Sequence, residues 1–113
     1  MMAKKLNLGA IPAEVLEFAL AELKKIRSGE VSFVAQDGYL MQVEINQRRR
    51  LADWDLEVPA WSEEFCAQIG RQIAREFSTL AYGRLVVKIQ KGRVVQIERT
   101  VQHRFTGLDG EGI

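Results

Sequence analysis

The chain has very little of the chemistry that cross-links or anchors a small protein. Its 113 residues include one cysteine, Cys66, and one histidine, His103. A single cysteine excludes an intramolecular disulfide, and nothing in the sequence indicates an oxidising compartment. No apolar run approaches the roughly 20 residues that a membrane-spanning helix needs, and the first eight residues lack the apolar stretch of a secretion signal. We therefore expect a cytoplasmic protein that does not bind a membrane.

An excess of charge of one sign is also missing, as are catalytic motifs. Lys and Arg number 16 against 15 Asp and Glu, and the resulting net charge of +1 predicts no class of partner. No catalytic, metal-binding or nucleotide-binding motif stands out. We expect no cofactor and no metal, and a non-enzymatic role is favoured over catalysis. For Cys66, packing near a helix start is favoured over a reactive thiol.

The sequence does contain an internal repeat. Shifted by 54 positions, residues 26–51 align with residues 80–105 without a gap. Six aligned pairs are identical: Gly29/Gly83, Gln36/Gln90, Gly38/Gly92, Gln42/Gln96, Glu44/Glu98 and Arg50/Arg104. The length is typical of one domain. We predict a single domain with repeat units at 12–51 and 62–105, an acidic linker at 52–61 and a flexible tail at 106–113.

Each unit has the pattern of a helix followed by a β-hairpin. Apolar residues recur at helical spacing after Pro12, and in the second unit after Ser62, a suitable N-cap. Gly70 lies inside the second helix, where we expect it to allow close approach of another element. The predicted fold is α+β in the order α-β-β-α-β-β, with a four-stranded antiparallel sheet, two helices on one face and pseudo-twofold symmetry. The sequence leaves open which strands meet at the centre.

The predicted turns contain Asp37-Gly38 and Lys91-Gly92. Asp-Gly alone suggests a two-residue loop. The alternation of apolar and polar residues along the strands favours a three-residue loop instead. A two-residue loop would place apolar residues opposite polar ones on both faces of the sheet. We therefore predict a bulge at each glycine, with positive φ. The predicted register pairs Phe33 with Met41, Val31 with Val43, Val87 with Val95 and Leu85 with Ile97. Gly29 and Gly83 are expected to end or closely follow the helices.

The second hairpin carries a longer pattern of glycine, alternating apolar residues, Gln-x-Gly, and then Gln-apolar-Glu. These are Gly83, Leu85-Val86-Val87, Gln90-Lys91-Gly92, Gln96-Ile97-Glu98 and a later Arg104. With its preceding helix, the pattern resembles the YezD-like family of small uncharacterised bacterial proteins, a domain of unknown function. The first unit matches less closely. The resemblance implies the fold and a tandem duplication of a unit that usually occurs singly, and it implies no activity, ligand or site.

The leading functional hypothesis is a protein-interaction module, which binds a protein partner or forms a homodimer through the open sheet face or an edge strand. Four aliphatic residues are expected as an apolar patch on that face: Val34, Leu40, Val86 and Val94. Candidate partner-binding residues are Gln42, Glu44, Gln96, Glu98, Trp54 and Trp61. The alternative for the four polar residues is a solvated face with cross-strand hydrogen bonds. The alternative for the tryptophans is packing of the linker on the domain.

The second hypothesis is a nucleic-acid-binding regulator. Residues 80–105 contain six basic residues against one acidic residue, and Arg48-Arg49-Arg50 adds a basic run. Nucleic-acid binding requires such side chains to share one face. Candidate residues are Lys88, Lys91, Arg93 and Arg104. The acidic residues at 52–65 offer another explanation, in which they neutralise the basic hairpin.

Overall fold

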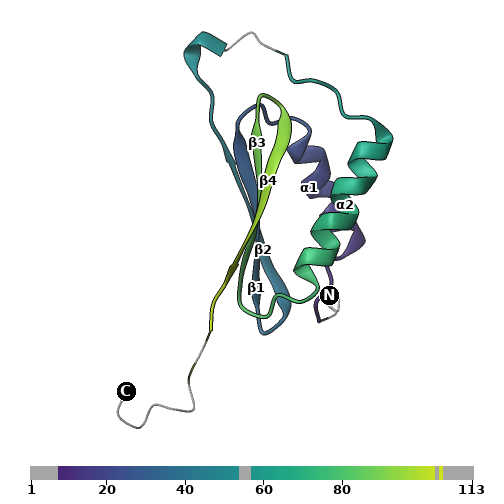
Figure 1. Ribbon diagram of the computed structural model, residues 1–113, viewed down its shortest axis with the longest axis vertical. Coiled ribbons are helices and arrows are strands. Elements are labelled where there is room, and N and C mark those ends of the chain that lie inside the picture. Colours follow the sequence, from purple (N-terminus) through teal and green to yellow (C-terminus); the bar gives the residue numbers. More distant parts are fainter. Residues whose placement is uncertain (1–7, 54–56, 104, 106–113) are drawn as a thin grey trace, which may run out of the picture.

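The computed structural model describes residues 8–53, 57–103 and 105. Its order is α-β-β-α-β-β, with both helices on one side of a four-stranded antiparallel sheet (Figure 1), which confirms the predicted α+β fold. The elements are α1 (Ala13–Leu23), β1 (Gly29–Gln36), β2 (Tyr39–Gln47), the 3-10 helix η1 (Leu51–Asp53), α2 (Glu63–Phe77), β3 (Gly83–Gln90) and β4 (Arg93–Val101). None of the helices among the described residues is long and apolar enough to span a membrane.

The two hairpins meet at the centre of the sheet through β1 and β3, and the strand order is β2-β1-β3-β4. Ser32 pairs with Val86, which lies 54 positions later in the chain. On either side of this pair, Val31 pairs with Val87 and Phe33 pairs with Leu85. Shifting one of these pairs by 54 gives the other, so the register is one that two identical units could also adopt.

The turns differ from the predicted three-residue loops. Gln36 pairs with Tyr39 and Gln90 pairs with Arg93, so each turn has two residues. The φ angles are 54° and 80° at Asp37 and Gly38, and 53° and 76° at the equivalent Lys91 and Gly92. Positive φ at both central residues defines the type I′ geometry that suits a two-residue hairpin. The positive φ predicted for the two glycines is confirmed, but the predicted loop length and the predicted bulge at each glycine are wrong.

A bulge inside each hairpin explains the error. The register shifts between Val34 and Ala35, which leaves Met41 as an extra residue on β2, and an equivalent shift leaves Val95 extra on β4. The observed pairs are therefore Phe33 with Val43, Val31 with Ile45, Val87 with Ile97 and Leu85 with Arg99. The extra residue shifts the register by one position, as the predicted third loop residue would have done. Apolar residues of the two strands therefore still share the face that packs against the helices.

The bulge also overturns the predicted apolar patch on the open face. Leu40 pairs with the buried Ala35 and is itself 8% exposed, within the core. Val94 packs against that core as well. Two of the four aliphatics therefore face the helices. Val34 and Val86 alternate with buried neighbours and remain half-buried on the open face.

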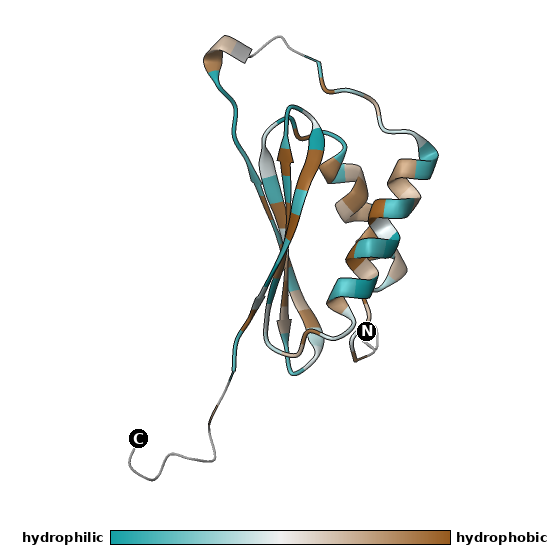
Figure 2. Ribbon diagram, viewed as in Figure 1, coloured by the Kyte–Doolittle hydropathy of each residue, from teal (hydrophilic) through white to brown (hydrophobic). Residues whose placement is uncertain are grey.

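The helices cover the sheet with apolar faces that the sequence predicts. Figure 2 shows α2 banded with hydrophilic and hydrophobic residues, and its buried apolar side chains include Ile69, Ile73 and Phe77. The Ser62 Oγ accepts a hydrogen bond from the Phe65 N–H at 3.0 Å, as expected of an N-cap. Gly70 is buried, and a Cβ there would lie 3.2 Å from Leu20 Cδ1 of α1. The close approach predicted at this glycine is confirmed.

Gly29 and Gly83 begin the two central strands rather than ending the helices, which stop at Leu23 and Phe77. Their φ angles are 151° and 140°. A Cβ at Gly29 would clash with the backbone carbonyl oxygen of Asn46 on β2. The glycines therefore allow the outer strands to approach the start of the central ones.

Candidate anion-binding site

Three segments that are distant in the sequence meet at one end of the sheet. The Gly92 N–H, in the β3–β4 turn, donates to the Arg27 carbonyl oxygen of the α1–β1 loop at 2.9 Å. The Arg48 N–H, just after β2, donates to the Ser28 carbonyl oxygen at 2.8 Å. Figure 1 shows this end, where the chain leaves β2 and later returns to α2. The strand order thus brings the α1–β1 loop and the end of β2 next to the β3–β4 turn.

These segments enclose a pocket of about 730 Å³. None of the described residues that line it is acidic; the neutral ones are Ser28, Gln47, Val58 and Gln90. The six basic residues are Lys25, Arg27, Arg48, Arg49, Arg50 and Lys91. We refer to it as the basic pocket. Of the residues named from the sequence as nucleic-acid candidates, Lys91 lies in it.

Some of the basic side chains contact groups at the margin of the pocket. Lys25 Nζ lies 3.2 Å from the Glu22 carboxylate, and Arg48 Nη2 lies 2.8 Å from that of Glu30. Arg27 Nη1 donates to the Glu57 carbonyl oxygen at 3.4 Å. The described lining itself contains six basic side chains and no carboxylate, so it carries an excess of positive charge. The pocket therefore attracts anions.

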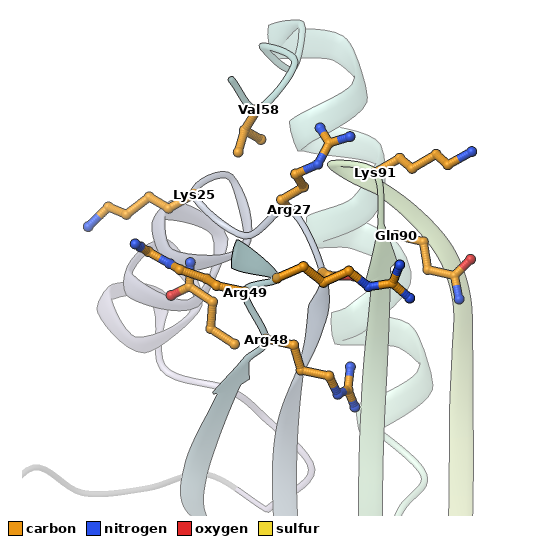
Figure 3. A pocket seen from close by; sticks show the side chains of 10 residues that line it. Lys25, Arg27, Arg48, Arg49, Val58, Gln90 and Lys91 are labelled. Carbon is orange, nitrogen blue, oxygen red and sulfur yellow. The ribbon is translucent and has the colours of Figure 1, made fainter. Parts of the chain in front are cut away.

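The basic side chains spread outward rather than converging on one point. Figure 3 shows Lys25 and Lys91 extending to opposite sides of the pocket, while Arg27 and Arg48 extend in two further directions. Such an arrangement presents positive charge over the width of the sheet end. It can contact several anionic groups at once.

The opposite end of the sheet repeats these backbone contacts with other side chains. There the Gly38 N–H donates to Ala81 O at 2.9 Å and the Gln102 N–H donates to Tyr82 O at 2.8 Å. The positions equivalent to Arg27, Arg48, Arg49 and Lys91 hold Ala81, Gln102, His103 and Asp37, whereas Arg50 corresponds to Arg104, which lies outside the described residues. Tyr82 hydroxyl donates to the Asp37 carboxylate. The backbone arrangement therefore does not require basic residues.

The open face carries a network of polar residues. Arg84 Nη1 lies 3.7 Å from the Glu44 carboxylate, and Lys88 Nζ lies 3.2 Å from that of Glu98. Gln42 donates to Glu44 and Gln96 donates to Glu98 along their own strands. These candidate residues lie on the two outer strands, β2 and β4, with β1 and β3 between them. They form one Gln–Glu pair on each outer strand, and each glutamate is also paired with a basic residue of β3.

The remaining candidates come from several elements. Trp61 is half-buried, packs edge-on against Phe65 with ring centroids 5.0 Å apart, and donates its indole N–H to Gly92 O at 3.3 Å. Lys88 is on the open face, whereas Arg93 is exposed at the start of β4. Trp54 and Arg104 lie outside the described residues. Within the described part of the chain, no three His, Cys, Asp or Glu residues are grouped to hold a metal ion.

Comparison with known families finds one similarity. The model of a family described as "Uncharacterized small protein (DUF2292)" matches residues 70–105, which include the end of α2 and the whole of β3 and β4. The match lies in the unit that carries the hairpin pattern more completely. Neither a curated protein nor a solved structure matches the chain.

Proposed function

We propose that this protein is a non-enzymatic binding protein whose basic pocket binds phosphate groups of its ligand. The observation that supports the proposal is the gathering of six Lys and Arg side chains in one pocket whose described lining has no carboxylate. Guanidinium groups match phosphate oxygens in geometry and charge, and they donate paired hydrogen bonds to them. At the equivalent end of the sheet, the positions of Arg27, Arg48 and Lys91 hold Ala81, Gln102 and Asp37, which supports a specific role for this charge.

Chromatography on phosphocellulose, a phosphate-bearing matrix, tests the proposal. The R48Q/R49Q/R50Q variant removes half of the basic residues from the pocket. The R71Q/R75Q/R84Q variant removes the same charge from α2 and the open face. We expect the wild type and this control to elute at similar salt concentrations and R48Q/R49Q/R50Q to elute well before both. Equal elution of the two variants, or no retention of the wild type, would contradict the proposal.

A second candidate function is protein interaction, including homodimer formation. The outer strands support it, because Met41 on β2 and Val95 on β4 are 56% and 52% exposed. Both strands are at the edges of the sheet, where unpaired backbone groups can take up a further strand. Light scattering at micromolar concentration tests the homodimer, since a mass near 12.8 kDa would reject it.

We further propose that the chain is a cytoplasmic, internally duplicated relative of the YezD-like proteins. The shared spacing of 54 residues, the matching bulges and turns, and the β1–β3 register support a duplication. In this account the second unit kept the family's hairpin pattern. The basic pocket then arose at one of two equivalent ends.

A further inference from the structure

We infer that the ligand of the basic pocket is nucleic acid, held by several phosphates of its backbone along the end of the sheet. The inference rests on the proposed function and narrows it from phosphate groups in general to a polymer. It concerns the charges at the end of the sheet, and not the open face.

The spread of the basic side chains favours a polymer. The pocket reaches from the end of β2 across β1 to the β3–β4 turn, and neighbouring strands lie about 4.8 Å apart. In Figure 3, Lys25 and Lys91 point away from each other across this span. A compact phosphate site would instead have donors that converge on one group, often with backbone N–H groups. Here the N–H groups of Gly92 and Arg48 already donate to carbonyl oxygens of the protein.

The chemistry of the lining favours contact with the backbone over recognition of bases. None of the described residues in the lining is aromatic, so the pocket offers no ring on which a base could stack. Trp61, beside the β3–β4 turn, is half-buried against Phe65, and its indole N–H donates a hydrogen bond to the Gly92 carbonyl oxygen. Phosphate contacts alone position a nucleic acid without reading its sequence. We therefore expect binding that depends little on sequence.

Negative charge limits the length of the contact. On the open face the carboxylates of Glu30, Glu44 and Glu98 are paired with Arg48, Arg84 and Lys88, so these pairs leave no excess of positive charge there, and the opposite end carries Asp37. A polyanion should therefore bind mainly at the basic end, where the pocket offers six basic partners. Each phosphate neutralised contributes roughly 0.7 to the salt slope of a single strand. The logarithm of the binding constant should fall against the logarithm of salt concentration with a slope no steeper than about −4.

Fluorescence anisotropy of labelled 12-nucleotide single strands, of several unrelated sequences, tests the inference across a salt series. A duplex of the same length is measured beside them. We expect similar affinities for all sequences, and a slope that R48Q/R49Q/R50Q flattens by about 2. The charge-matched R71Q/R75Q/R84Q variant should keep the wild-type slope. Circular dichroism establishes that both variants are folded.

The possible failures separate the inference from the proposed function. Binding of inorganic tripolyphosphate without binding of either oligonucleotide would overturn nucleic acid as the ligand and leave a phosphate site. Failure of tripolyphosphate, oligonucleotides and phosphocellulose would overturn both. Oligonucleotide binding that R48Q/R49Q/R50Q does not weaken would reject the basic pocket as its location. Stronger binding to phosphatidylglycerol vesicles than to oligonucleotides would overturn the inference in favour of a membrane surface.

Discussion

Arg48 and Glu30 form an ion pair at the border between the basic pocket and the open face, with 2.8 Å between Nη2 and Oε1. Asn46 donates to the same carboxylate at 2.9 Å. The Asn46 hydrogen bond and then the hydrogen bond and charge of Arg48 lower the pKa of Glu30, and they outweigh the opposing effect of desolvation. Glu30 therefore stays ionised beside the pocket and holds one of its arginines.

The first prediction concerns the titration of Glu30. R48Q should raise the pKa of its carboxyl group, because a charged donor is lost. Since the folded-state pKa is below the ordinary value, the pair stabilises the fold above that value, and this contribution is lost as the pH falls through the folded-state pKa. NMR titration of the Glu30 carboxyl carbon measures both midpoints. R84Q, a change at the Glu44 ion pair, should leave the midpoint unchanged. Equal midpoints in wild type and R48Q would refute the coupling.

The second prediction tests the bulge on β2 through two adjacent residues. Leu40 is in the core and Met41 is 56% exposed. L40A should lower the free energy of unfolding by about 2–3 kcal/mol, as expected for a buried leucine. M41A should change it by less than about 1 kcal/mol. Urea denaturation measures both. The predicted three-residue loop would reverse the order, with Met41 facing the core.

The third prediction compares two glycines with different surroundings. G29A should lower the free energy of unfolding by more than about 2 kcal/mol, because a Cβ meets the fixed carbonyl of Asn46 and φ is positive. G70A should change it by at most about 1 kcal/mol, since gained helix propensity offsets contact with the flexible end of Leu20. Thermal or urea unfolding of the two variants measures the difference. An equal loss of stability in G29A and G70A would contradict this prediction.

The fold was predictable from the sequence where local patterns and the repeat decided it. The N-cap at Ser62, the apolar stripe of α2 and the positive φ of the two turn glycines are predicted correctly. The hairpin register was not, because a bulge has no clear sequence signature and a parity argument without it requires a longer loop. Leu40 and Val94 were consequently assigned to the wrong face. The strand order could not be predicted, because the apolar pattern of each hairpin does not indicate which of its two strands lies at the centre of the sheet.

The candidate site was predictable only in part. The run Arg48–Arg50 and the turn residue Lys91 were noted, but as separate features of two hairpins. Lys25 and Arg27 were missed, because their role depends on the neighbouring β3–β4 turn. One signal was available: equivalent positions of the two units hold Arg27 and Ala81, and Lys91 and Asp37. Unequal charge at equivalent positions indicates residues that the fold itself does not require.

Titration of ¹⁵N-labelled protein with inorganic tripolyphosphate tests the central claim most directly, since each end of the sheet serves as the control for the other. We expect amide shift changes to cluster at Lys25–Ser28, Gln47–Arg50 and Gln90–Lys91. The equivalent amides around Asp37, Tyr82 and Gln102 should remain unchanged. Shift changes of equal size at both ends, or changes confined to the open face, would contradict the assignment of the basic pocket as a phosphate-binding site.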